Sequence, residues 1–291
     1  MKTKHNSRQG SKPSDPNRIG RDFKRRLRRG DQMVGAMVFE YLRPSLVKIF
    51  RRAGFDFIFI EKEHGIFDSK ELPDFVLSAR DNGVPVVSKI GSLNRSEVTR
   101  LIDSGIVGIQ LPRTESREQL MELVQYMKFP PIGTRAGAPC FGNVDYSWAS
   151  DYDVGGRKWQ KGANEATSIV AQIETAKGYE HAEEIITTPY VDMVYVGPYD
   201  FSISMGRPGE YDHPDVAGPM REILALCRKH GVPFGTTASG PNAAAKWIAA
   251  GCQFFDAVDE LSLIDAGARQ TMDTYRNMFA TIRPKAIRAR Q

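Results

Sequence analysis

The sequence predicts a single (β/α)₈ TIM barrel, and three observations lead to this α/β fold class. Eight short apolar runs, rich in β-branched and aromatic residues, alternate along the chain with longer amphipathic runs. Such alternation of strands and helices is typical of a parallel sheet covered by helices. A length of 291 residues fits one barrel of this kind. An open doubly wound sheet is the alternative, but no Gly-x-Gly-x-x-Gly fingerprint follows the first strand.

The chain begins with a basic segment. Residues 1–30 hold eleven of the 40 Lys and Arg residues but only two of the 35 acidic residues. Their balance of +9 exceeds the +5 of the whole chain, so the remaining residues carry −4. We expect residues 1–20 to be a disordered basic tail, residues 21–282 to form the catalytic barrel and residues 283–291 to be a basic C-terminal tail.

The composition argues against several classes of protein. No stretch approaches the roughly 20 consecutive apolar residues of a membrane span. The N-terminus lacks the apolar core of a secretory signal, so we expect a cytoplasmic enzyme. The three cysteines are too few and too scattered for a disulfide framework or a zinc knuckle.

The strands are predicted from short runs in which Val, Ile and Phe dominate, bounded by Gly, Pro or charged residues. In chain order they are Met33–Phe39, Phe55–Glu61, Pro85–Ile90, Val107–Leu111, Ser168–Ile173, Met193–Val196, Pro233–Thr237 and Phe254–Val258.

The helices are predicted from amphipathic runs, several of which end at a glycine suited to a left-handed C-cap. The run Lys24–Arg29 could contact nucleic acid, but we favour a first helix that ends at Gly30. The later helices are Pro44–Ala53, Ser69–Asn82, Ser96–Ser104, Ser116–Met127, Ala176–Thr187, Val216–His230, Ala243–Ala250 and Leu261–Ile282.

One connection is much longer than the others. Residues 128–167, between the fourth helix and the fifth strand, are rich in Pro and Gly and contain no predicted element. Long connections in compact domains are usually functional.

Polar residues at strand ends are the candidate site, because the strand ends of such a barrel face its active-site mouth. The second strand runs into His64, which is suited to moving a proton near neutral pH. The third strand presents Lys89 as a cation for a substrate oxygen, and an ordinary rim lysine is its alternative. Asp103, late in the third helix, is a candidate to orient His64, although a solvated helix carboxylate is the simpler reading.

Two carboxylates follow neighbouring strands. Glu174 ends the fifth strand and Asp200 follows the sixth, so the two side chains should lie within about 5–8 Å. Carboxylates this close repel each other unless a cation lies between them, and Mg²⁺ and Mn²⁺ prefer oxygen ligands. A 2-oxo acid could complete the metal shell, and the ion would then polarise its carbonyl and stabilise an enolate. The alternative is that both carboxylates merely cap helices.

These motifs resemble those of the HpcH/HpaI aldolase/citrate lyase family. Gln-Ile-Glu-Thr, followed by Gly-Pro-x-Asp-x-Ser in this order and spacing, is specific to that family. The resemblance covers roughly residues 21–280. It is carried by Phe59–His64, Pro130–Arg135, Val170–Thr175, Val196–Ser202 and Met205-Gly206.

The resemblance implies a barrel whose last helix is exchanged between subunits of a trimer or hexamer. The implied reaction is cleavage of a 4-hydroxy-2-oxo acid to pyruvate and an aldehyde, with Mg²⁺, Mn²⁺ or Co²⁺. Glu174 and Asp200 would be the ligands, and His64 the acid/base with Asp103 as its partner. The implied substrate contacts are Gln172, the backbone around Pro198, Tyr199 and Asp200, and Arg135 at the distal end of the substrate or at a neighbouring subunit.

The chain departs from the family pattern at three places. Glu61-Lys62 stands where the family usually has Asp-Gly or Asp-Met, and Lys89 (or Ser88, given a one-residue gap) where it has Arg. Tyr199 stands where Ala, Asn or Thr is common. Since lysine does not reproduce the planar fork of arginine, another enolate reaction at the same metal is an alternative: decarboxylation, C–C bond formation or acyl-CoA cleavage.

Two further hypotheses concern a different catalytic mechanism and a non-enzymatic binding protein. A Schiff-base aldolase would use Lys89 but leaves Glu174 and Asp200 unexplained. A non-enzymatic barrel with a basic arm would bind nucleic acid or a partner, but the body outside residues 1–30 is acidic.

Overall fold

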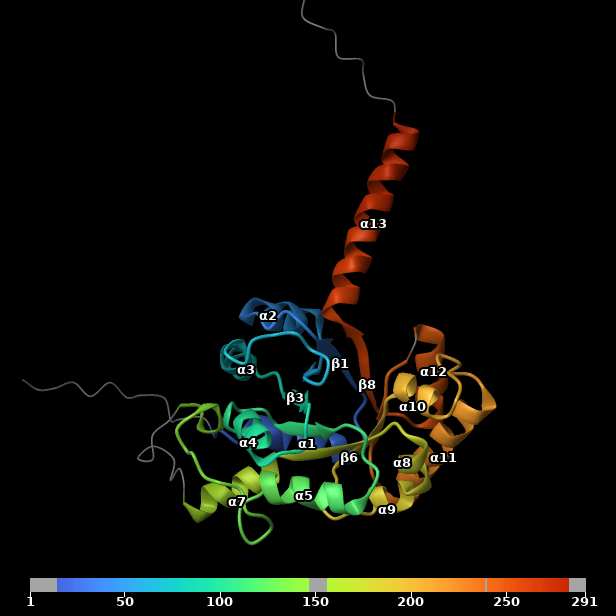
Figure 1. The fold of residues 1–291 in the computed structure, drawn as a ribbon. Coiled ribbons are helices and arrows are strands. Elements are labelled where there is room, and N and C mark those ends of the chain that lie inside the picture. The colour runs from blue at the N-terminus through green and yellow to red at the C-terminus, as the bar shows by residue number, and fades with distance from the viewer. Residues whose placement is uncertain (1–14, 147–155, 239, 283–291) are drawn as a thin grey trace, which may run out of the picture.

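The computed structural model describes residues 15–146, 156–238 and 240–282. Eight parallel strands form a closed barrel in which each strand pairs with the next and β8 pairs with β1 (Figure 1). The predicted fold class is therefore confirmed, and the open sheet is excluded. The strands are β1 Met33–Val38, β2 Phe57–Ile60, β3 Val86–Lys89, β4 Gly108–Leu111, β5 Ser168–Ile173, β6 Met193–Val196, β7 Phe234–Thr236 and β8 Phe254–Asp259.

Helices connect the strands and form the outer layer. They are α1 Arg18–Arg29, α2 Pro44–Ala53, α3 Glu71–Asp81, α4 Arg95–Asp103, α5 Arg117–Met127, the 3₁₀ turn η1 Gly142–Val144, α7 Arg157–Ala166, α8 Ala176–Glu180, α9 Ala182–Ile186, α10 Pro198–Ser204, α11 Pro214–His230, α12 Pro241–Ala250 and α13 Glu260–Thr281. Residues 1–14 of the expected basic tail and the C-terminal tail 283–291 lie outside the described residues.

The sequence did not predict α7, which lies in the long connection 128–167. Its ten residues contain one large apolar side chain, Trp159, which packs against Phe129. One apolar anchor gives no helical periodicity to detect, so the segment could not be distinguished from a loop.

Aromatic residues fill the barrel interior. The rings of Phe57 and Phe254 stack with centroids 4.0 Å apart, and Phe23 of α1 meets both edge-on. Gly35 of β1 is needed here because a Cβ would lie 2.2 Å from the Phe57 ring. With Leu27 buried in the same cluster, α1 is packed against the aromatic interior of the barrel.

The basic run of the sequence forms this first helix, which ends at Gly30 in a left-handed conformation as predicted. Two of its basic side chains form ion pairs with carboxylates of the barrel. Lys24 lies 2.9 Å from Asp192, and Arg26 lies 2.7 Å from Asp56. These pairs neutralise part of the charge that suggested a nucleic-acid contact.

The last helix leaves the barrel. In Figure 1 α13 projects away from the other helices. Its first residue, Glu260, is buried and accepts hydrogen bonds from the backbone N–H groups of Phe39 and Glu40, at 2.8 and 2.6 Å. Farther along, apolar side chains such as Ile264 and Phe279 are 58% and 76% exposed. The helix thus carries an apolar surface that this chain alone does not cover.

Across the described ranges, we find no helix whose length and apolar content would let it cross a membrane.

Replacing Phe23 by Ala should lower the free energy of unfolding by about 3–5 kcal/mol, because a buried ring would leave a cavity among Phe57 and Phe254. Urea denaturation measures this loss. Ile66→Ala, at an 84% exposed position, is the control and should change the value by no more than about 0.5 kcal/mol. Equal effects of the two changes would mean that α1 is not part of the core.

Candidate active site

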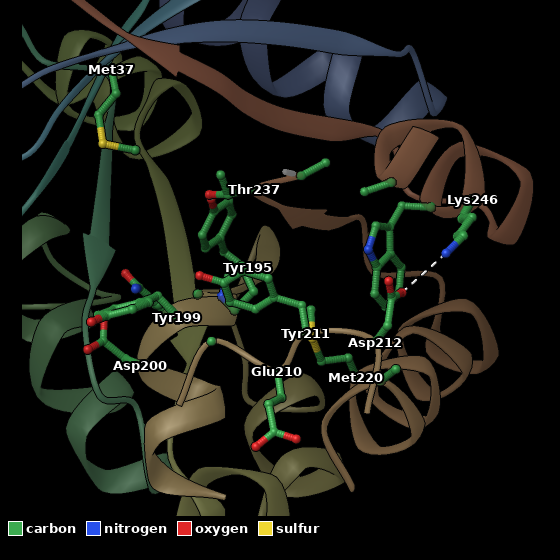
Figure 2. Close-up of a pocket in the computed structure, with 18 of the residues that line it drawn as sticks. Met37, Tyr195, Tyr199, Asp200, Glu210, Tyr211, Asp212, Met220, Thr237 and Lys246 are labelled. Atoms are coloured by element: carbon green, nitrogen blue, oxygen red, sulfur yellow. Dashed lines mark hydrogen bonds and ion pairs between the residues drawn. The ribbon is translucent and has the colours of Figure 1, made fainter. Parts of the chain in front are cut away.

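A cavity of about 930 Å³ opens at the C-terminal ends of the strands. It is lined by residues that end or follow β2, β3, β5 and β6, as the barrel geometry requires. Figure 2 shows it reaching outward to the loop that precedes α11 and to Lys246 of α12, which pairs with Asp212 at 3.2 Å. The sequence-predicted residues that line it are His64, Lys89, Gln172, Pro198, Tyr199 and Asp200.

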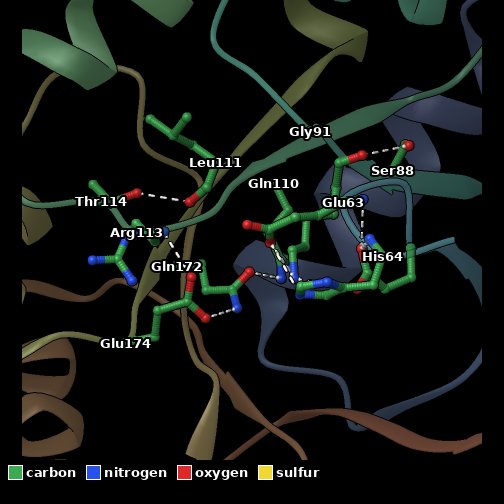
Figure 3. Close-up of polar contacts among 12 residues, drawn as sticks. Glu63, His64, Ser88, Gly91, Gln110, Leu111, Arg113, Thr114, Gln172 and Glu174 are labelled. Carbon is green, nitrogen blue, oxygen red and sulfur yellow. Dashed lines mark hydrogen bonds and ion pairs between the residues drawn. The ribbon is translucent and has the colours of Figure 1, made fainter. Parts of the chain in front are cut away.

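Glu174 is 2% exposed and lies beside Gln172 and Gly197, which line the cavity. One of its carboxylate oxygens accepts a hydrogen bond from the backbone N–H of Arg113 at 2.7 Å, and the other accepts one from the Gln172 amide (Figure 3). Burial raises the pKa of Glu174 to about 7; the charge of Lys89 opposes this shift and that of Asp200 adds to it. The buried carboxylate therefore lacks a full counter-charge.

Gly197 lines the cavity and lies beside Glu174. The pairing of β5 with β6 sets Ile173 opposite Val196, so the residues that follow these two lie side by side. A Cβ on Gly197 would stand 2.9 Å from a carboxylate oxygen of Glu174. Glycine at this position therefore avoids a side chain pressed against that oxygen, which also accepts the hydrogen bond from Gln172.

Asp200 is the second carboxylate and lies in the first turn of α10. It is half-buried, lines the cavity and influences the pKa of Glu174. The described residues contain no cluster of three or more His, Cys, Asp or Glu side chains arranged to hold a metal. The donor set is thus two carboxylates, whose hard oxygens and negative charge suit Mg²⁺ or Mn²⁺ with positions left for other ligands.

The helix-cap alternative is not what the structure uses. Thr175, not Glu174, caps α8, with its hydroxyl accepting from the backbone N–H of Gly178 at 2.9 Å. Gly197 holds the N-cap position of α10, and no side chain caps that helix end. Both carboxylates are therefore left for another role.

Gln110 and Gln172 hold the Glu174 side chain in place. The Gln110 amide donates to the Gln172 carbonyl oxygen at 2.6 Å, and the Gln172 amide in turn donates to Glu174 (Figure 3). Gln110 is the next-to-last residue of β4 and lines the cavity. It was not among the predicted site residues, although a polar residue near the end of a strand is a signal that the sequence contains.

Lys89 is 5% exposed and lies between carboxylates. Its Nζ is 2.7 Å from Glu63 and 3.4 Å from Glu61. Burial works to lower the pKa of Lys89, but the charges of Glu61, Glu63 and Glu174 outweigh it and the pKa is raised. The side chain is an ammonium ion suited to hold a substrate oxygen. A Schiff base needs the neutral amine, so this environment disfavours the Schiff-base alternative.

His64 stands at the cavity wall with its ring largely exposed. Glu61, which is buried, accepts from the backbone N–H groups of Glu63 and His64 at 2.8 and 3.4 Å. The imidazole lies 3.8 Å from the Glu63 carboxylate. In this chain the turn that carries His64 is thus shaped by Glu61 and Glu63.

The structure does not bring Asp103 or Arg135 to this cavity. Asp103 bonds to Arg135 at 2.9 Å and to Asn143 at 2.8 Å, instead of to His64. Asp103 ends α4, and helices of such a barrel run opposite to the strands, so their C-terminal ends lie away from the mouth. Arg135 stacks on Phe129 and borders a separate cavity of about 30 Å³. Within one chain, the expected contacts of Asp103 with His64 and of Arg135 with substrate are absent.

Comparison with known proteins identifies the family of the chain. Residues 36–266 match the family model described as HpcH/HpaI aldolase/citrate lyase. The chain is 26% identical over 235 residues to the 2-dehydro-3,6-dideoxy-6-sulfogluconate aldolase of Pseudomonas putida, across 81% of this chain and 88% of the relative.

Solved structures show the same fold. The crystal structure of an HpcH/HpaI aldolase from Desulfitobacterium hafniense DCB-2 matches with a TM-score of 0.80 and 28% identity, covering 87% of this chain and 96% of the other. The citrate lyase beta subunit of M. tuberculosis, complexed with oxaloacetate and magnesium, matches with a TM-score of 0.51 and 17% identity, over 80% and 93% of the two chains. At that identity it shows likeness of fold alone.

Lys89→Met should destabilise the protein by about 3 kcal/mol, because it leaves the buried carboxylate of Glu61 without its counter-charge. Lys246→Met is the matched control, since that lysine side chain is 63% exposed and its ion pair contributes little. Chemical denaturation at pH 7.5 compares the two. A Lys89→Met protein as stable as the control would show that Glu61 does not depend on Lys89.

Proposed function

The chain belongs to the HpcH/HpaI aldolase/citrate lyase family, and from this premise we propose that it is a divalent-metal-dependent aldolase. Its family and relatives make it an aldolase or lyase of this superfamily. The finer proposal is a class II aldehyde-lyase that cleaves a 4-hydroxy-2-oxo acid to pyruvate and an aldehyde. The observation that carries it is the pair Glu174 and Asp200 at the ends of the neighbouring strands β5 and β6.

We propose that Glu174 and Asp200 hold Mg²⁺ or Mn²⁺, with Co²⁺ as a further candidate. Their carboxylate oxygens, the incomplete charge balance at Glu174 and the absence of a side chain at Gly197 beside it support this assignment. When bound, the ion would polarise the carbonyl of the 2-oxo acid as a Lewis acid.

Side chains of the protein would transfer the proton, stabilise the developing charge and bind the substrate. His64 would take the proton of the C4 hydroxyl, the C3–C4 bond would break toward the 2-oxo acid fragment, and the proton would return to C3 to give pyruvate. The Lys89 ammonium would hold the oxygen on which negative charge develops. Gln172 and the backbone around Tyr199 line the cavity where pyruvate would lie.

A second candidate keeps the fold and metal but changes the enolate reaction, to decarboxylation, C–C bond formation or acyl-CoA cleavage. Two observations favour it: Lys89 is engaged by Glu61 and Glu63, and the Tyr199 ring is 59% exposed in the cavity. A panel of 4-hydroxy-2-oxo acids, oxaloacetate and acyl-CoA esters separates the two. A preference for an acyl-CoA ester would overturn the aldolase proposal.

We further propose that the chain forms a homo-oligomer in which α13 packs on another copy. Its exposed apolar side chains, with Phe279 76% exposed, support this, because monomers rarely expose such surfaces. Light scattering should give a mass that is a multiple of 32.5 kDa, and Phe279→Asp should lower that mass. A monomer at micromolar concentration would contradict the proposal.

Removing the metal should abolish cleavage. EDTA should stop pyruvate release from a 4-hydroxy-2-oxo acid, and Mn²⁺ or Mg²⁺ should restore it. Glu174→Gln should lower kcat/KM by about 10²–10³-fold, since a metal Lewis acid contributes several kcal/mol. Glu210→Gln, a carboxylate in the outer part of the same cavity, is the control and should retain metal dependence. Activity that survives both EDTA and Glu174→Gln would sink the proposal.

A further inference from the structure

A buried carboxylate lies inside the barrel, apart from the residues assigned above. Asp256 of β8 is 1% exposed, and neither of its carboxylate oxygens has a hydrogen-bond partner among the described residues. Strand residues two apart face the same side, so Asp256 shares the barrel interior with Phe254. An ionised carboxylate without partners is costly in such surroundings, which makes Asp256 unusual.

Among the described residues, three ionisable groups act on the pKa of Asp256. Tyr195 comes from β6, Lys89 from β3 and Glu61 from the end of β2. β1 presents Gly35 beside it, which carries no charge. Burial raises the pKa of Asp256 to about 7, while Tyr195 and Lys89 oppose the shift and Glu61 adds to it. Both protonation states are therefore accessible near neutral pH.

Tyr195 connects this carboxyl group to the cavity. Its hydroxyl lies 2.5 Å from that of Thr237, and either oxygen can be the donor. Both side chains line the cavity (Figure 2). Burial raises the pKa of Tyr195, with Cys252 among the groups that contribute, so its hydroxyl keeps its proton. That single proton can go toward Asp256 or toward Thr237.

The Tyr195 ring has little freedom to move away. A Cβ on Gly235 of β7 would lie 3.0 Å from the ring, so glycine is needed for the ring to pack there. The hydroxyl is close enough to Asp256 to lower its pKa, although the two groups do not form a well-aligned hydrogen bond. As neighbours, a protonated Asp256 can donate to the Tyr195 oxygen and an ionised Asp256 can accept from the Tyr195 hydroxyl.

We propose that Asp256 is a positioning residue that acts through Tyr195 and decides whether Thr237 offers a proton or a lone pair to the cavity. Protonated Asp256 donates to the Tyr195 oxygen, Tyr195 donates to Thr237, and Thr237 is free to donate to a substrate oxygen. Ionised Asp256 accepts from Tyr195, Thr237 donates to Tyr195, and only lone pairs face the cavity. The ligand chemistry is a carbonyl or carboxylate oxygen that needs a donor.

This inference rests on the proposed function only for the identity of the ligand. Pyruvate, with three oxygen acceptors, should bind more tightly when Asp256 holds its proton. Losing one hydrogen bond to a charged group costs about 1.4 kcal/mol or more, which is about tenfold in Kd. The Kd of pyruvate should therefore rise about tenfold between pH 6 and pH 8.5.

Infrared spectroscopy tests the proton itself, without any need for turnover. The wild-type protein should show a buried carboxylic acid C=O band at pH 6 that disappears by pH 9. Asp256→Asn should remove the Asp256 part of this band, and Asp273→Asn, at an exposed position of α13, should not. A difference spectrum between wild type and Asp256→Asn without an acid band would overturn the inference.

Calorimetric titration with pyruvate in the presence of Mn²⁺ tests the coupling. Asp256→Asn, Asp256→Leu and Tyr195→Phe should each flatten the pH step in Kd, whereas Asp273→Asn should keep it. A step that persists in all three variants would assign it to another group and overturn the inference. If neither wild type nor variant binds pyruvate at any pH, the proposed function fails, and the infrared band still decides whether Asp256 holds a proton.

Melting temperatures show whether the variants fold. When a carboxyl group has a raised pKa in the folded state, the folded protein loses stability as the pH rises toward that pKa. Asp256→Asn should therefore melt above wild type at pH 9, and the difference should narrow at pH 5. A lower melting temperature at pH 9 would mean that the fold is more stable with a charge on Asp256 than without one, which contradicts a carboxyl group that keeps its proton toward neutral pH.

Discussion

The site depends on the parallel pairing of β5 with β6. This register sets Glu174 beside Gly197, where a side chain would press against a carboxylate oxygen. Asp200 follows in the first turn of α10, lines the cavity and is close enough to raise the pKa of Glu174. A shift of one residue would turn Gln172 and Glu174 together away from the cavity, because strand side chains alternate between the faces of the sheet.

Charge is distributed unevenly along the barrel axis. Aromatic rings fill the interior and α1 packs against them, while Lys89 and the carboxylates around it gather at the mouth. Asp256 and Tyr195 are buried near the boundary of these two zones, and the Asp256 carboxylate has no hydrogen-bond partner among the described residues. Electrostatic effects are strong in such surroundings, so one proton on Asp256 can change what the cavity offers to a substrate.

Much of the fold and part of the site could be predicted from the sequence. The alternation of strand and helix patterns predicted the barrel. The rule that strand ends face the active-site mouth identified His64, Lys89 and Asp200 as candidate site residues. The family resemblance is confirmed by the match over residues 36–266. Local patterns carry no information on pairing between distant segments, so the partners of Asp103 could not be predicted. Asp256 was missed because a mid-strand residue is ordinarily assigned to the core.

The proposed function depends on a divalent ion held by Glu174 and Asp200 together. Anomalous diffraction from crystals of the protein grown with Mn²⁺ and pyruvate locates such an ion. We expect one manganese peak within coordination distance of both carboxylates and of two pyruvate oxygens. Manganese bound elsewhere, or pyruvate bound in the cavity without metal, would contradict it.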